Sequence, residues 1–172
     1  MRFPGRVSVS PARSSRAPKV RTVAIALGSN VGERETHLEH AVRRLGGIVR
    51  ALRVSSFHET LPEGITDQPL FLNAAAVGES TDPPEALLGR LQEIEMERGR
   101  ERPSSSPGGP RTLDLDLILV GDEVVQTGTL TVPHPRFRER AFVLEPLAEV
   151  APDLVDPESG LTVQELLERL DR

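Results

Sequence analysis

Two aspartates interrupt an otherwise apolar segment, and this pattern is the strongest constraint that the sequence places on the fold. The segment LDLDLILV (113–120) carries Leu, Ile or Val at all of its other positions. Such a run is typical of a buried β-strand. Because strand side chains alternate between two faces at ~3.3 Å per residue, Asp114 and Asp116 share a face and lie about 6.6 Å apart.

Two unpaired carboxylates on a buried face would be costly, so the pair needs cationic partners. Arginines are one alternative, because Arg111 stands just before the strand. Divalent cations are the other, since carboxylates at this spacing can hold one ion or two. The chain has no cysteine, which excludes disulfides and thiolate sites, and an oxygen site favours Mg²⁺ or Mn²⁺. The pattern D-x-D alone also occurs in glycosyltransferases, polymerases and plain surface strands.

Arginines cluster before the aspartate strand. Arg98, Arg100 and Arg102 end the preceding helical pattern, and a Ser/Pro/Gly-rich loop separates them from Arg111. Arginine forks bind phosphate oxygens, although cations at a helix end also complement its dipole. Beside a metal-binding pair, they indicate a polyphosphate substrate with Mg²⁺. The loop between them is predicted to close over that substrate.

His134 is flanked by prolines in TVPHPRFRER, so its backbone is held extended. Its ring could donate to a phosphate, act as an acid or base, or cap a turn. The arginines that follow it again favour an anion.

The hydrophobic periodicity predicts an α+β fold. Strands are expected at 22–30, 48–60, 70–80 and 113–120, helices at 32–47 and 82–100, a hairpin at 121–135, and helical or mixed segments at 138–152 and 161–170. Asp82 is the expected N-cap of the second helix, with Pro83 at its first position. The order β-α-β-β-α-β indicates a ferredoxin-like core, a mainly antiparallel sheet with helices on one face, followed by C-terminal additions.

Charge divides the chain into two parts. Residues 1–21 carry six basic residues and no acidic one, whereas the remainder is acidic. We expect 1–21 to be a disordered basic extension and 22–172 to form one domain. The composition of 1–21 also fits a transit peptide or a nucleic-acid-binding arm. Because this segment has no apolar stretch of the kind found in signal peptides, we do not expect a secretory signal. No apolar run reaches the ~18 residues of a membrane span, so we expect a cytoplasmic protein without a membrane partner.

Several motifs occur in a fixed order between about residues 22 and 165: VAIALGSNVG, VSSFHET, DQPLFLNAA, GPRTLDLD and LTVPHP. Together they resemble the 6-hydroxymethyl-7,8-dihydropterin pyrophosphokinases of folate biosynthesis, and GPRTLDLD and VPHP are the most specific. The resemblance implies transfer of diphosphate from ATP to the pterin hydroxymethyl group, with release of AMP. It also implies ATP as co-substrate and two Mg²⁺ ions. We expect a monomer without a nucleic-acid partner.

The resemblance assigns roles residue by residue. Asp114 and Asp116 become metal ligands, and they are catalytic together with Arg100 and Arg111. The ATP site comprises Gln92, Glu95, Arg102, Arg111, Leu117, Thr131, His134 and Arg140. The pterin site comprises Thr60, Phe71, Asn73 and Phe142. The last set suits a flat heterocycle, because an amide offers a donor and an acceptor and phenylalanines offer flat walls.

Two departures from the family and two rival interpretations remain. Gly108 stands where the family often has Trp, and TLPEG, with Glu63, replaces the usual TPPLG. A ferredoxin-like RNA-binding module is one rival, but the acidic domain and the lack of Tyr and Trp disfavour it. Another Asp-x-Asp enzyme, such as a nucleotidyltransferase or glycosyltransferase, is the second. Attack at the α-phosphorus would release pyrophosphate instead of AMP.

Overall fold

A computed structural model describes residues 18–64, 67–99 and 111–171. Its elements are β1 (Arg21–Ser29), α1 (Arg34–Gly46), β2 (Arg50–Val54), β3 (His58–Thr60), β4 (Phe71–Ser80), α2 (Pro84–Glu97), β5 (Asp114–Val120), β6 (Val125–Gln126), β7 (Thr131–Val132), the 3-10 turn η1 (Phe137–Glu139), α3 (Ala141–Val150) and α4 (Val163–Leu170).

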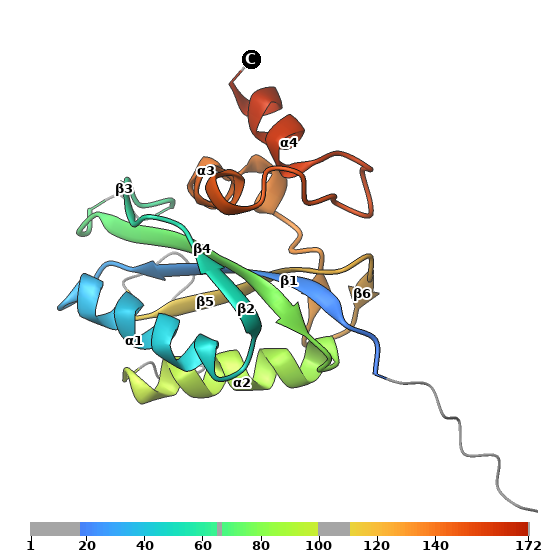
Figure 1. Ribbon diagram of the computed structural model, residues 1–172. Coiled ribbons are helices and arrows are strands. Elements are labelled where there is room, and N and C mark those ends of the chain that lie inside the picture. Colours follow the sequence, from blue (N-terminus) through green and yellow to red (C-terminus); the bar gives the residue numbers. More distant parts are fainter. Residues whose placement is uncertain (1–17, 65–66, 100–110, 172) are drawn as a thin grey trace, which may run out of the picture.

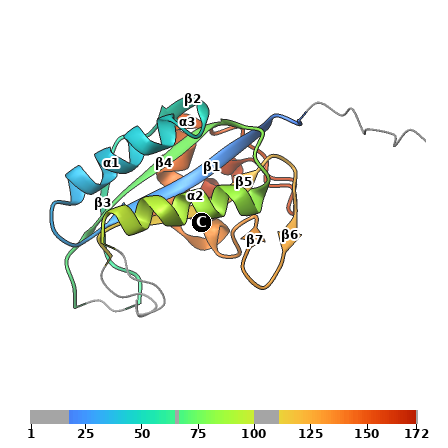
Figure 2. The ribbon, with the colours of Figure 1, turned by 90° about the horizontal axis from the view of Figure 1, so that it is seen from below.

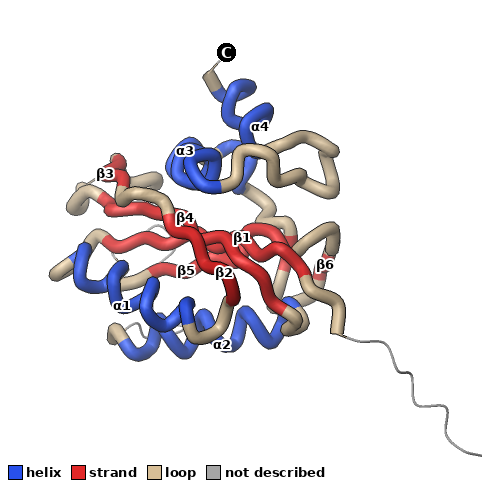
Figure 3. The backbone as a smooth tube through the Cα atoms, viewed as in Figure 1, coloured by secondary structure: helices blue, strands red, loops and turns tan. Residues whose placement is uncertain are grey.

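An antiparallel sheet with strand order β2-β4-β1-β5 forms the centre, and β3 pairs with β4 (Figure 3). Helices α1 and α2 lie side by side across one face (Figure 2), whereas α3 and α4 lie beyond the other (Figure 1). The predicted ferredoxin-like core is therefore confirmed, with the C-terminal helices as additions on the opposite face.

Helices α1 and α2 bury one side chain per turn against the sheet. Leu38, Ala41 and Leu45 of α1 are 0% exposed. Leu87 and Leu91 of α2 are each 1% exposed. Their spacing of three or four residues places them on one helix face. Burial of each leucine stabilises the fold by about 1.5–3 kcal/mol, which fixes both helices on this face.

A β-bulge between β1 and β5 decides which side chains of β5 face α3. Ala24 is opposite Leu119 and the next residue, Ile25, is opposite Leu117, so Ile118 is the extra residue. Leu115 and Leu117 therefore belong to the core under α1 and α2, whereas Ile118 and Leu119 both belong to the core under α3.

Two local predictions are wrong. The segment 48–60 forms two strands instead of one, because Ser55 interrupts it: the Ser55 hydroxyl accepts the Ala75 N–H at 2.9 Å. The N-cap of α2 is Pro83 and not Asp82. Pro84 follows Pro83 and excludes it from helical geometry, so Pro83 is extended (φ −60°, ψ 151°) and the helix begins one residue later than expected.

The C-terminal segment is anchored by a buried ion pair. Asp156 is 0% exposed, and both of its oxygens accept hydrogen bonds from Arg138 (2.5 and 2.9 Å). Thr162 and Glu165 then form a capping box that starts α4.

Within the described ranges, no helix is long and apolar enough to cross a membrane.

Candidate active site

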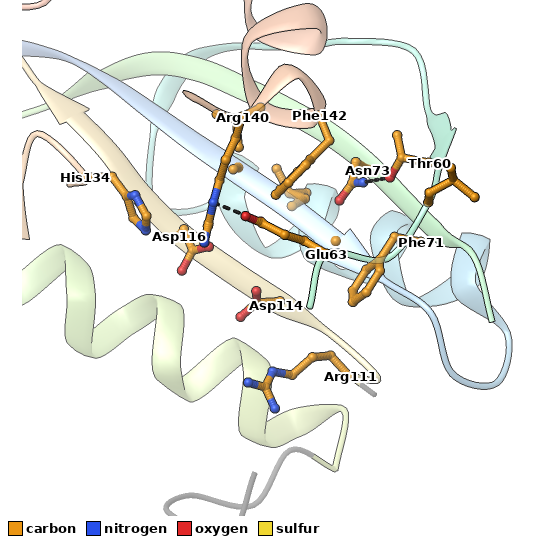
Figure 4. A pocket seen from close by; sticks show the side chains of 15 residues that line it. Thr60, Glu63, Phe71, Asn73, Arg111, Asp114, Asp116, His134, Arg140 and Phe142 are labelled. Carbon is orange, nitrogen blue, oxygen red and sulfur yellow. Dashed lines mark hydrogen bonds and ion pairs between the residues drawn. The ribbon is translucent and has the colours of Figure 1, made fainter. Parts of the chain in front are cut away.

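A cavity of about 330 Å³ opens between the α3 face of the sheet, the loop after β3 and the segment before α3 (Figure 4). It brings together most of the residues that the sequence singled out: Thr60, Phe71, Asn73, Arg111, Asp114, Asp116, His134, Arg140 and Phe142. Its other lining residues are Ala26, Leu27, Gly28, Leu61, Glu63 and Val143.

Small residues of the central strand form the floor of this cavity. In β1, Gly28 lies between Asn73 of β4 and Asp114 of β5, and Ala26 lies opposite Asp116. A Cβ atom at Gly28 would lie 2.8 Å from the Asn73 amide oxygen. The missing side chain at Gly28 therefore makes room for that amide, a role that sequence patterns could not reveal because it depends on strand register.

One end of the cavity combines an amide with aromatic walls. Asn73 is only 7% exposed, and its amide nitrogen donates to the Thr60 hydroxyl at 2.5 Å. This bond leaves the amide oxygen as the acceptor next to the cavity. Phe71 from β4 and Phe142 from α3 also line this space (Figure 4). The arrangement suits a flat heterocycle with N–H donors on its edge.

The other end gathers charges. Asp114 and Asp116 are half-buried on the same face, which confirms the alternation predicted for β5, and Arg111, Arg140 and His134 lie around them (Figure 4). Among the described residues there is no group of three or more acidic or histidine side chains that could hold a metal alone. A pair of carboxylates beside cationic side chains fits Mg²⁺, which usually takes its other ligands from water and substrate phosphates.

Arg111 is positioned by its backbone. Its N–H donates to the Asn30 side-chain oxygen at 2.8 Å, and its carbonyl accepts the Asn30 N–H at 3.0 Å. The Asn30 amide also donates to Gln68 at 2.7 Å and so ties the start of β5 to the loop before β4. One terminal nitrogen of Arg111 is buried without a hydrogen-bond partner among the described residues, which favours an anionic ligand there.

His134 is held neutral. Its backbone N–H donates to the Ile118 carbonyl, and its ring Nδ1 accepts the Arg136 N–H at 3.2 Å. Burial, followed by the charge of Arg140, lowers the pKa of His134 to about 4, although Asp114 acts in the opposite direction. A neutral ring that accepts at Nδ1 carries its proton on Nε2 and can donate it to a phosphate oxygen.

Several predicted ATP-site residues do not line the cavity. Glu95 of α2 is 1% exposed and accepts the Leu115 N–H at 3.2 Å, a contact that joins α2 to β5. Leu117 lies in the core under α1 and α2, while Gln92 and Thr131 are half-buried on α2 and β7. Their roles toward ATP stay predictions. Arg100, Arg102, Gly108 and the predicted closing loop lie outside the described residues.

Comparison with known proteins agrees with this geometry. A family model for 7,8-dihydro-6-hydroxymethylpterin-pyrophosphokinase (HPPK) matches residues 24–152. A 2-amino-4-hydroxy-6-hydroxymethyldihydropteridine pyrophosphokinase of Bacillus subtilis is 49% identical over 128 residues, which cover 73% of this chain and 75% of the relative. The Pseudomonas aeruginosa protein of that name is 41% identical over 150 residues, which cover 86% and 91%.

A crystal structure of Plasmodium falciparum HPPK-DHPS superposes with a TM-score of 0.70 at 13% identity. The match covers 90% of this chain but 46% of that longer one, so it supports the fold alone. Together with the family match and the bacterial relatives, these findings show that the chain belongs to the 7,8-dihydro-6-hydroxymethylpterin-pyrophosphokinase family and is a pyrophosphokinase.

Proposed function

We propose that the protein transfers diphosphate from ATP to the hydroxymethyl group of 6-hydroxymethyl-7,8-dihydropterin, with release of AMP, in tetrahydrofolate biosynthesis. The observation that carries the proposal is the composition of one cavity. An amide and two phenylalanines line it together with two neighbouring aspartates and two arginines. A flat heterocycle and a polyphosphate need these two kinds of surface side by side.

The pterin occupies the end with Asn73. Because one N–H of the Asn73 amide donates to Thr60, the orientation of the amide is fixed and its oxygen can accept N–H groups from the pterin edge. Phe71 and Phe142 provide apolar walls for the ring, and aromatic contacts of this kind contribute about 0.5–1.5 kcal/mol beyond area burial. Gly28 leaves the space in which these contacts form.

The triphosphate of ATP occupies the charged end. Arg111, Arg140 and the Nε2–H of His134 donate to phosphate oxygens. Asp114 and Asp116 would hold Mg²⁺, and we expect two ions, in keeping with the family resemblance. Bound Mg²⁺ would supply positive charge that offsets the charge of the phosphates. Gln92, Glu95, Arg100, Arg102, Leu117 and Thr131 complete the site by resemblance.

In the reaction, the pterin hydroxyl oxygen forms a bond to the β-phosphorus, and the bond between that phosphorus and the α-phosphate oxygen breaks. AMP leaves with the bridging oxygen, and the hydroxyl proton passes to solvent or phosphate. Phosphoryl transfer of this kind depends on positioning and charge stabilisation more than on a strong base. The chain's contribution is therefore to hold the two substrates in line.

We further propose that residues 22–172 act as a cytoplasmic monomer, without nucleic acid. ATP as co-substrate is in keeping with a cytoplasmic location, and the absence of Tyr and Trp stacking platforms disfavours a nucleic-acid partner.

The test is product identity. The purified protein is incubated with ATP, Mg²⁺ and the hydroxymethylpterin, and the products are separated by chromatography and followed by ³¹P NMR. We expect AMP and the diphosphorylated pterin in equal amounts, and no AMP when the pterin is omitted. Release of pyrophosphate or inorganic phosphate in place of AMP would exclude the proposed reaction and favour attack at the α- or γ-phosphorus.

A further inference from the structure

A third carboxylate enters the cavity from the loop after β3. Glu63 lines the cavity, and one of its oxygens lies 3.1 Å from Arg140 Nε while the other lies 2.7 Å from a terminal nitrogen of Arg136. Figure 4 shows the Glu63 side chain reaching across toward Arg140 and Asp116. A side chain of this loop therefore contacts an arginine that the proposed function assigns to the triphosphate.

The contact between Glu63 and Arg140 is poorly matched. Arg140 Nε is buried and has no hydrogen-bond partner of adequate geometry in the described part of the chain, although Glu63 lies within ion-pair distance. The Arg140 side chain is 18% exposed and that of Glu63 is 41% exposed. The Nε–H of Arg140 is therefore close to a carboxylate but poorly aligned with it. It would form a stronger hydrogen bond with a better-placed anion, because charge-assisted hydrogen bonds depend on geometry.

We propose that Glu63 is an internal competitor of the ATP triphosphate for Arg140, and that it sets the nucleotide affinity of this site. The proposal rests on the proposed function. A phosphate oxygen and the Glu63 carboxylate require the same donor, so nucleotide binding displaces Glu63 from Arg140. Asp114 and Asp116 already line the cavity, and Glu63 adds a further like charge that the triphosphate must overcome.

The opposite role, in which Glu63 orients Arg140 for phosphate, predicts the opposite effect of its removal. Glu63→Gln keeps the size of the side chain and removes its charge. If Glu63 competes, this variant binds nucleotide more tightly, whereas if Glu63 positions Arg140, the variant binds it more weakly. The sign of the change in Kd decides between the two roles.

Glu139 provides a matched control. It also lies 2.7 Å from Arg136, but it does not line the cavity, and within the described residues it forms no ion pair with the neighbouring Arg140. Glu139→Gln removes the same charge a short distance from the same arginines. A general electrostatic effect would appear in both variants, whereas competition for Arg140 appears only in Glu63→Gln.

The experiment is calorimetric titration of the full chain with Mg²⁺ and the α,β-methylene analogue of ATP, which cannot release AMP. We expect Glu63→Gln to lower the Kd about two- to fivefold, the scale of a partly exposed ion pair, and Glu139→Gln to change it less. Adenosine, which lacks phosphates, should bind both variants and the wild type equally. In an Arg140→Ala background, Glu63→Gln should give a clearly smaller gain, because only the like-charge repulsion and no longer the competition for Arg140 is removed.

An unchanged or raised Kd in Glu63→Gln, with wild-type melting temperature, overturns the competition. Equal gains in Glu63→Gln and Glu139→Gln overturn it as well, because they reveal only net charge. Failure of the proposed function is separate: in that case the wild type itself neither binds the analogue nor forms AMP from ATP and the pterin.

Discussion

Gly28 of β1 and Asn73 of β4 are cross-strand partners, and the Asn73 amide oxygen occupies the space that a side chain at Gly28 would fill. A methyl group at 2.8 Å from that oxygen forces the amide to move. We expect Gly28→Ala to raise the KM for the pterin by at least about tenfold, since misplacement of about 1 Å can cost 10²-fold. Steady-state kinetics with both substrates varied checks this.

Gly89→Ala is the control for this substitution. Gly89 lies inside α2 and a Cβ there meets nothing within 4 Å. The change should leave both KM values unaltered and stabilise the fold by about 0.5–1 kcal/mol. A Gly28→Ala enzyme with wild-type pterin KM would show that the Asn73 amide does not contact the pterin.

The aspartate pair should be required for turnover but not for folding. We expect Asp114→Asn or Asp116→Asn to lower kcat at least about 10³-fold with little change in melting temperature, because removal of one of two neighbouring like charges does not harm the metal-free fold. Activity is measured over a Mg²⁺ titration, with Asp122→Asn, an 80% exposed residue after β5, as the control. Near wild-type turnover of either variant at limiting Mg²⁺ would exclude the metal role.

His134 should make stability depend on pH. The unfolded ring takes up a proton near pH 6.5, whereas the pKa of folded His134 is about 4. Between these values the unfolded chain binds more protons, so the stability that this residue supplies is lost as the pH falls from 6.5 toward 4. We expect the wild type to lose about 1–2 kcal/mol more than His134→Gln between pH 7 and pH 5, after allowance for partial exposure. Urea unfolding at both pH values measures this, and equal losses in the two proteins would contradict it.

Asp156 should anchor the C-terminal helices. Burial alone would raise the pKa of Asp156, but Arg138, Ser159 and the Glu158 N–H outweigh it and lower this pKa to about 2. Its contribution is therefore present above pH 3.8 and is lost as the pH falls toward 2. We expect Asp156→Ala to destabilise the fold by about 3 kcal/mol at pH 7, because it strands a partly buried arginine. Thermal melts check this, and kcat at low temperature should stay unchanged because Asp156 does not line the cavity.

Local pattern was sufficient to predict the core elements and the shared face of Asp114 and Asp116, because alternation along one strand is a local property. Local pattern was a poor guide to the start of α2. Asp82 is a favourable N-cap residue, but the two prolines that follow it move the N-cap to Pro83. Local pattern also could not reveal that Gly28 accommodates Asn73, because that contact depends on how separate strands pair.

Contacts between loops were the least accessible to sequence reasoning. In the sequence, Glu63 is a departure from the usual TPPLG motif, but its pairing with Arg140 and Arg136 joins residues more than seventy positions apart. Asn30 was visible only as part of a motif, and its bonds to Arg111 emerge from the approach of β1 to β5.

The bulge at Ile118 has a consequence for folding as well as for the site. If β5 paired with β1 one residue out of register, Asp114 and Asp116 would turn toward α1 and α2, and two leucines would fill the cavity instead. Two carboxylates trapped among apolar side chains would destabilise that misfolded arrangement by several kcal/mol each. The two aspartates thus disfavour the misaligned pairing of β5 with β1 while the chain folds, before any substrate is bound.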